Sequence, residues 1–185
     1  MDAIECILKR ASVRKYQDRP VERELIEKLL LCGFHAPTAG NSRAWQFVVV
    51  QNRDTLARMS LAAPGHACLK GASLAIVACV DWKKDQRPVH DNSEHGVAAA
   101  CENILLAAHG LGLGGVWLAS YPRPQVMDYL RELLSIPSDV DPYAVLSLGY
   151  PDESPAPKGL YEPDAVHFEA YEPPLSGEKV QGNAA

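Results

Sequence analysis

The chain has 185 residues, 47% hydrophobic and 22% charged, a composition typical of one soluble globular domain with a sizeable core. Its 18 basic and 23 acidic residues give a formal net charge of −5, which argues against binding nucleic acid or an anionic membrane through bulk charge. Any phosphate-bearing ligand must therefore be held by a local basic pocket.

The sequence gives no sign of secretion or membrane insertion. No run reaches the roughly 18 apolar residues of a transmembrane helix, and the acidic segment Met1–Cys6 lacks the apolar core of a signal peptide. The five cysteines are odd in number, widely spaced and without a Cys-x-x-Cys pair. We therefore expect a cytoplasmic protein with reduced, mostly buried thiols.

Turn residues and hydrophobic periodicity divide the first half of the chain into helices and strands. The helices carry apolar residues on one face, and Asp2 is placed to cap the first of them. The strands are rich in β-branched residues, and the second is a continuous apolar run expected to be covered on both faces. In chain order we predict helices 2–9 and 21–34, strand 45–51, helix 52–62 and strand 73–81.

The second half begins with a polar segment, residues 82–92, which we expect to be a surface excursion able to form a lid over a site. The next helix is apolar nearly all round and should be the central buried helix, with Asp91 or Asn92 as its cap. Pro122 is placed at the first position of the last helix. In chain order we predict helix 93–109, strand 116–119, helix 123–134 and strand 143–150.

After Pro151 the chain becomes rich in proline and lacks the apolar content of a second core. We expect an extended arm there, with residues 165–168 able to add an edge strand. The whole order predicts an α+β fold in a single domain over residues 1–175, followed by a disordered tail over 176–185. The apolar helix and the long arm suggest a partner subunit, around which the arm could wrap.

A short basic segment is the first candidate for chemistry. Arg10, Ser12 and Arg14 offer two guanidinium forks and a hydroxyl within five residues, between two predicted helices. Arginine pairs with phosphate bidentately, and a hydroxyl adds a further donor. Taken alone, the segment also fits arginines that are solvated or paired with carboxylates.

Groups elsewhere in the sequence could complete a ligand site. The main-chain amides of Leu118, Ala119 and Ser120 are expected to be free where a strand ends, and could donate to a planar heteroaromatic ligand. Asn41 is either a common turn residue or an amide that reaches a polar ring edge. Lys158 is either solvated or, if the arm folds back, a third cation near a phosphate.

Two other patterns, a glycine-rich segment and a histidine cluster, resemble a dinucleotide-binding turn and a metal site. Their positions in the chain argue against both functions. The glycines of the segment 110–115 follow a helix and precede a strand, which is the reverse of a dinucleotide-binding turn, and a helix C-cap explains them. His90 and His95, beside Asp91 and Glu94, lie roughly 140° apart around a helix and could not share one metal. We therefore expect no metal site, and a metal hydrolase stays only as an alternative of another class.

Four motifs occur in order along the chain and cover essentially residues 3–171. They are Arg10–Tyr16 with Asp18-x-Pro20-Val21, Ala36–Trp45, Ala107–Trp117 and Leu148–Pro151. Together they resemble the nitroreductase family of flavin mononucleotide (FMN) enzymes. The resemblance implies an α+β homodimer with a central, mostly antiparallel sheet flanked by helices, an extended C-terminal arm and two FMN sites at the subunit interface.

The resemblance also implies which residues bind FMN. The basic segment would hold the phosphate and ribityl chain, the Asn41 loop would lie near the flavin, and the main chain after residue 117 would approach the reactive edge of the ring. Lys158 would add positive charge to the phosphate. The cofactor-binding residues so implied are Arg10, Ala11, Ser12, Arg14, Asn41, Leu118, Ala119, Ser120 and Lys158.

In such enzymes the flavin takes a hydride from NADH or NADPH and passes electrons to a small-molecule acceptor such as a nitroaromatic or a quinone. No protein acid or base is obligatory, so no catalytic residue is nominated. The alternatives are another reductive chemistry on this scaffold, such as dehalogenation or flavin fragmentation, and a flavin-binding or redox-sensing protein without turnover.

The sequence departs from the family pattern at three places. Arg43-Ala44 precedes Trp45 where the family usually has Gln-Pro, so Arg43 either changes the charge of the pocket or faces solvent. The arm lacks a further arginine near Leu160. Gly65-His66 stands where a residue with an amide often precedes the second strand, and these differences predict weaker FMN binding.

Overall fold

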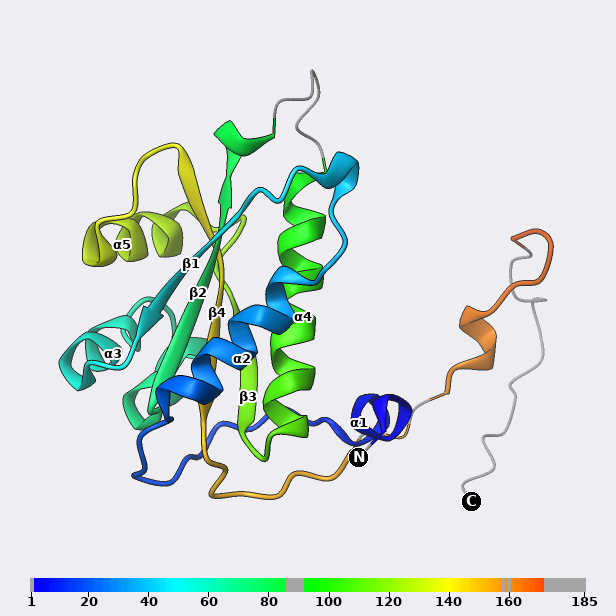
Figure 1. Cartoon of the computed structure of the whole chain (residues 1–185), viewed down its shortest axis with the longest axis horizontal. Coiled ribbons are helices and arrows are strands. Elements are labelled where there is room, and N and C mark those ends of the chain that lie inside the picture. Colours follow the sequence, from blue (N-terminus) through cyan, green and yellow to red (C-terminus); the bar gives the residue numbers. More distant parts are fainter. Residues whose placement is uncertain (1, 86–91, 158, 160, 172–185) are drawn as a thin grey trace.

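A four-stranded antiparallel sheet, in the order β1-β2-β4-β3, forms the centre of the structure (Figure 1). The computed structural model describes residues 2–85, 92–157, 159 and 161–171. The strands are β1 Trp45–Val50, β2 Leu74–Asp81, β3 Gly114–Ala119 and β4 Val140–Gly149. The helices are α1 Ala3–Lys9, α2 Arg23–Phe34, α3 Arg53–Met59, α4 Ser93–Gly110 and α5 Pro124–Leu134. Four short 3₁₀ helices are η1 Ala39–Asn41, η2 Pro64–Gly71, η3 Trp82–Lys84 and η4 Pro163–Ala165.

Helices cover both faces of the sheet, and each face has its own apolar core. Helices α2 and α4 lie on one face, and α3 and α5 lie on the other (Figure 1). Every residue of β2 is buried, because its alternate side chains enter opposite cores. This confirms the prediction of a strand covered on both faces, and the α+β sheet flanked by helices is confirmed with it.

The boundaries of several elements differ from the sequence-based prediction. Strand β4 begins at Val140 rather than at residue 143, because an irregularity in its pairing with β2 between Ala78 and Cys79 lets Pro142 join the ladder. Helix α5 begins at Pro124 with Arg123 as its N-cap, so the prediction of Pro122 at the first helical position is wrong. Helix α3 ends at Met59, three residues before the predicted end.

The glycine-rich turn after α4 and the C-terminal arm also differ from expectation. Gly114 and Gly115 belong to β3 and do not merely precede it. Residues 165–168 form no strand: η4 ends at Ala165, and the side chain of Phe168 is 82% exposed with no strand paired beside it in the described part of the chain. The predicted lid lies largely outside the described residues, as do the tail 176–185 and Lys158.

The segment between α1 and α2 is held against the open edge of β3. Ser12 pairs with Gly115 in a parallel bridge, and the Val13 amide donates to the Gly115 carbonyl oxygen at 3.0 Å. The Tyr16 hydroxyl lies 2.7 Å from the Val13 carbonyl oxygen and within hydrogen-bonding distance of β4. A Cβ atom at Gly114 would lie only 2.7 Å from the Val13 Cβ. The absence of a side chain at Gly114 therefore permits this close approach.

Among the residues that the structure describes, no helix has both the length and the apolar character needed to cross a lipid bilayer. The longest, α4, has 18 residues and carries charged and polar side chains at its N-terminal turn and on its outer face.

The contact at Gly114 yields a stability prediction. We expect Gly114→Ala to lower the free energy of unfolding by about 1–3 kcal/mol, because the new methyl group overlaps Val13 in a packed region. Gly71→Ala is the matched control: no atom lies within 4 Å of its Cβ position, so its effect should stay within about 0.5 kcal/mol. Urea unfolding of both variants measures the difference, and equal midpoints would contradict the role given to Gly114.

Candidate functional site

The predicted basic segment lines an open groove of about 750 Å³, a size that accommodates a cofactor. Arg10, Ala11, Ser12 and Arg14 form one wall of the groove. The other described lining residues come from α1 and from the start of the arm: Ile7, Leu8, Pro155, Ala156, Gly159 and Tyr161.

The local backbone explains why the three donor side chains converge. Arg10 caps the C-terminus of α1 with an extended conformation, and its amide donates to the Cys6 carbonyl oxygen. The chain then continues extended along β3, so side chains two residues apart point to the same side. Val13 faces the other way and is buried. The sequence spacing of Arg10, Ser12 and Arg14 therefore becomes a common face.

The two arginines differ in their present partners. The Arg10 Nε lies 3.5 Å from the Glu102 carboxylate of α4, a partly exposed pair that contributes little to stability. Arg14 forms no ion pair within the described part of the chain. Arg10 therefore agrees in part with the alternative interpretation, in which the arginines pair with carboxylates of the protein. The guanidinium group of Arg14 remains available to a ligand.

Glu153, which is not among the predicted site residues, connects the arm to the basic segment through hydrogen bonds. One carboxylate oxygen of Glu153 accepts hydrogen bonds from the amides of Arg14, at 2.5 Å, and Lys15, at 3.1 Å. The Arg14 amide is the main cause that lowers the pKa of the Glu153 carboxyl. Since 138 or more residues separate these partners, no local pattern could have revealed the contact.

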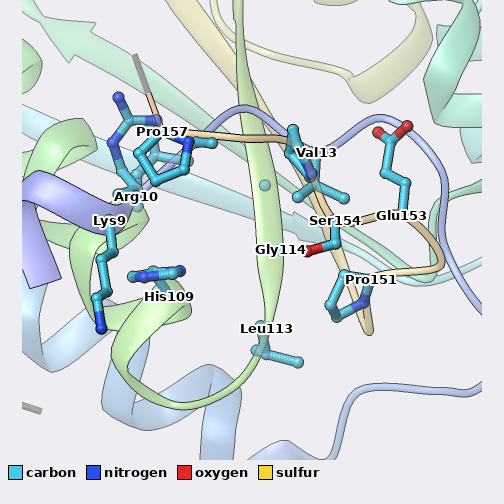
Figure 2. A pocket seen from close by; sticks show the side chains of 14 residues that line it. Lys9, Arg10, Val13, His109, Leu113, Gly114, Pro151, Glu153, Ser154 and Pro157 are labelled. Carbon is cyan, nitrogen blue, oxygen red and sulfur yellow. The ribbon is translucent and has the colours of Figure 1, made fainter. Parts of the chain in front are cut away.

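A smaller cavity of about 330 Å³ adjoins the groove, and Arg10 and Ala11 line both (Figure 2). Lys9 and His109 lie beside Arg10 in this view, whereas Glu153 lies on the other side of β3 (Figure 2). The basic groups therefore gather on one side, and the nearest carboxylate of the arm points elsewhere. Two of these cations have carboxylate partners, since Lys9 pairs with Glu5 and Arg10 lies near Glu102.

The prediction of free amides after residue 117 is only partly right. The Ser120 amide donates to the Tyr143 carbonyl oxygen at 3.1 Å, so it is not free. In an antiparallel pair, the amides of alternate residues point toward the partner strand. The Leu118 amide, two residues before Ser120, therefore also points toward β4. The Ala119 amide points to the outer edge instead, because β3 is an edge strand that Ser12 and Val13 cover only near Gly115.

The open edge of β3 thus links two parts of the candidate site. The exposed Ala119 lies four positions along β3 from Gly115, where the basic segment docks. At the rise of a β-strand this separation is about 13 Å. A long ligand with an anionic end and a planar polar end fits such an arrangement of donors.

Asn41 does not lie beside the predicted arginines of its own chain. Its loop lies at the N-terminal end of α4, where Thr38 packs on Gly96, whereas α1 and the basic segment lie at the opposite end of that helix (Figure 1). Helix α4 has 18 residues and is therefore about 27 Å long. Asn41 and the arginines of one chain are too far apart to contact the same small ligand.

His66, at one of the departures from the family pattern, turns into the protein. Its side chain is 1% exposed, and neither ring nitrogen has a hydrogen-bond partner among the described residues. Burial, with a smaller contribution from the charge of Arg123, lowers the pKa of His66 to about 4. His66 is therefore a neutral, internal imidazole at the position where the family often has an amide-bearing residue.

The cysteines and acidic residues provide no competing site in the described part of the chain. No group of three His, Cys, Asp or Glu residues there could hold a metal ion, and His90 and Asp91 lie outside the described residues. All five cysteines are free, though only Cys79 and Cys101 are fully buried. Burial raises the pKa of the Cys79 thiol to about 12, so it stays protonated at neutral pH.

The fold and the groove define an α+β protein in which an arginine segment docks beside the open edge of a sheet. The family model described as "Nitroreductase family" matches residues 7–67 and 61–150. The chain therefore belongs to the nitroreductase family, and the resemblance of its four motifs is confirmed.

Individual relatives agree in sequence and in structure. A Methanothermobacter thermautotrophicus protein, provisionally named NADH dehydrogenase/NAD(P)H nitroreductase, is 42% identical over 92% of this chain and 88% of its own length. A Parabacteroides distasonis structure with the same provisional name has a TM-score of 0.87 at 38% identity, covering 91% of this chain and 98% of that one. An FMN-dependent nitroreductase from Clostridium difficile R20291 has a TM-score of 0.84 at 33% identity, covering 91% and 99%.

The Glu153 contact predicts a pH-dependent effect on stability. The folded-state pKa of Glu153 is lowered, so its stabilising contribution is present above the unfolded pKa of about 4.3 and is lost as the pH falls through the folded value. We expect Glu153→Gln to lower the thermal midpoint at pH 7, and this difference from the unsubstituted protein should shrink below about pH 4. Asp152→Asn, which removes the same charge next door, should leave the pH 7 midpoint near its original value; equal losses in both variants would contradict the contact.

Proposed function

We propose that this protein binds FMN in the groove and catalyses electron transfer from NADH or NADPH to a small-molecule acceptor such as a nitroaromatic or a quinone. The observation that carries the proposal is the face formed by Arg10, Ser12 and Arg14 beside the open edge of β3. Membership of the nitroreductase family, and the likeness to an FMN-dependent nitroreductase over 91% of the chain, support it.

The donors of the groove suit the parts of FMN. The guanidinium forks of Arg10 and Arg14 and the Ser12 hydroxyl bind the phosphate and the ribityl chain, with the main chain of Ala11 alongside. Outside the groove, further along the open edge of β3, the outward amide of Ala119 donates to the polar edge of the ring system. Lys158 lies outside the described residues, and its contribution of a further cation to the phosphate stays a prediction from the sequence.

The groove itself supports a reaction carried by the cofactor. Its described lining contains no carboxylate, histidine or cysteine. When bound, FMN accepts a hydride from the reduced nicotinamide and passes the electrons to the acceptor. The protein's part is to bind and orient FMN, and no acid or base in the described lining is assigned to catalysis.

The separation of Asn41 from the arginines is the reason to propose a homodimer. Helix α1 exposes Ile4 and Leu8, each 67% exposed, and the arm exposes Phe168 and Tyr171. Apolar side chains exposed in this number mark a surface that a partner covers. In a symmetric dimer each FMN site combines the arginines of one chain with the Asn41 loop of the other.

The direct test is the visible absorption spectrum of the purified protein, recorded before and after addition of FMN and then of NADH or NADPH without oxygen. We expect a bound flavin spectrum that bleaches with a reduced nicotinamide and returns when a nitroaromatic or a quinone is added. A flavin that does not bleach would support a binding or sensing role without turnover, and the absence of bound flavin would overturn the proposal.

Substitution of the basic segment tests the phosphate assignment. We expect Arg10→Ala and Arg14→Ala each to raise the dissociation constant of FMN by about 10- to 100-fold, since each removes a charge-assisted hydrogen bond. Arg23→Ala, on the exposed start of α2, is the control for net charge and should bind FMN as before. Fluorescence titration with FMN measures the constants; unchanged affinity in the double variant would show that the phosphate lies elsewhere.

A further inference from the structure

The loop that carries Asn41 also presents Arg43, a residue that departs from the family pattern. The Arg43 amide donates to the Thr38 Oγ1 at 3.3 Å, and its guanidinium Nε donates to the Asn41 Oδ1 at 3.1 Å. Thr38 in turn packs against α4 at Gly96, where a Cβ atom would lie 2.7 Å from the threonine Cγ2. Arg43 is therefore fixed to the same rigid support as Asn41.

The backbone of this loop is unusual for its residue types. Gly40, Asn41 and Arg43 have φ angles of 57°, 54° and 47°, in the left-handed region. Glycine and asparagine tolerate this region, but a long side chain such as arginine rarely adopts it. Such conformations persist where the surrounding structure enforces them, and they concentrate at ligand-binding sites. The backbone thus sets the direction in which the Arg43 side chain leaves the loop.

The charge of Arg43 is not used within the described part of the chain. The residue is exposed, and none of the ion pairs formed by the described residues includes it. Its Nε donates to Asn41, which leaves the two terminal nitrogens of the fork to bind another group. A fork of this geometry matches a carboxylate or a phosphate.

We propose that Arg43 is a substrate-recognition residue that binds an anionic group, either a phosphate of the nicotinamide donor or a carboxylate of the electron acceptor. The inference rests on the proposed FMN function and deepens it. The FMN phosphate is assigned to Arg10 and Arg14, so the anion that Arg43 binds belongs to a substrate. Arg43 acts by attraction and orientation and takes no part in hydride transfer.

The experiment uses substrate pairs that differ in one anionic group. For the acceptor, 4-nitrobenzoate is compared with 4-nitrobenzamide; for the donor, NADPH and NADH are compared with reduced nicotinamide riboside, which has no phosphate. Arg43→Gln removes the charge and keeps an unbranched side chain, and Arg43→Lys keeps the charge without the fork. Arg23→Gln is the control for net charge, and binding of benzoate and benzamide to the oxidised FMN protein, followed by the flavin spectrum, gives a readout without turnover.

We expect Arg43→Gln to raise the KM of the anionic substrate of one pair by about 10- to 100-fold relative to the KM of its neutral partner. This is the effect expected from the loss of one charge-assisted hydrogen bond. A change confined to 4-nitrobenzoate, matched by weaker benzoate binding, assigns the acceptor; a change confined to NADPH or NADH assigns the donor. Arg43→Lys should keep part of the preference for the anionic substrate. Arg23→Gln should leave the KM of every substrate unchanged.

Three results would overturn the inference while leaving the proposed function in place. The first is an active Arg43→Gln protein in which the ratio of KM between the anionic and the neutral substrate is unchanged in every pair. The second is an equal rise in KM for the charged and the neutral substrate of a pair, which would indicate a structural role for Arg43. The third is dissociation of the dimer in size-exclusion chromatography, which would place Arg43 at the subunit contact. If the unsubstituted protein binds no flavin, the proposed function and the inference both fail.

Discussion

The candidate site depends on one close approach, that of the segment after α1 to the open edge of β3. The hydrogen bond from the Val13 amide to Gly115, and the space left by Gly114, hold an extended segment parallel to the strand. Because that segment is extended and anchored, Arg10, Ser12 and Arg14 share one face. Glu153 adds a second anchor from the arm, so the segment after α1 and the start of the arm meet beside the groove.

Helix α4 imposes the second constraint, because it separates the two groups of predicted site residues by about its own length of 18 residues. The arginines lie near its C-terminal end, and Thr38 and Asn41 lie near its N-terminal end. The same chain cannot bring both groups to one flavin. The proposed symmetric dimer would resolve this conflict, and the apolar side chains exposed on α1 and the arm are a surface that a partner chain could cover.

Local patterns were sufficient to predict most of the fold and the basic segment, because periodicity and spacing are properties of neighbouring residues. The buried strand β2 and the common face of Arg10, Ser12 and Arg14 are examples. The amides of Leu118 and Ser120 are not free as predicted, because their partners lie on β4, and only the order of strands in the sheet decides which edge is open. The Glu153 contact was missed for the same reason: it joins segments that are distant in the sequence.

The division of labour between the two ends of α4 has a chemical consequence. At one end the groove offers arginine side chains and, in its described lining, no carboxylate, histidine or cysteine, which suits a bound cofactor that carries the reaction. At the other end, a strained loop fixes an arginine whose fork remains available. Affinity for the cofactor and preference among substrates would then reside on different segments. Substitutions in the loop could change which substrates are used without altering the phosphate contacts of the flavin.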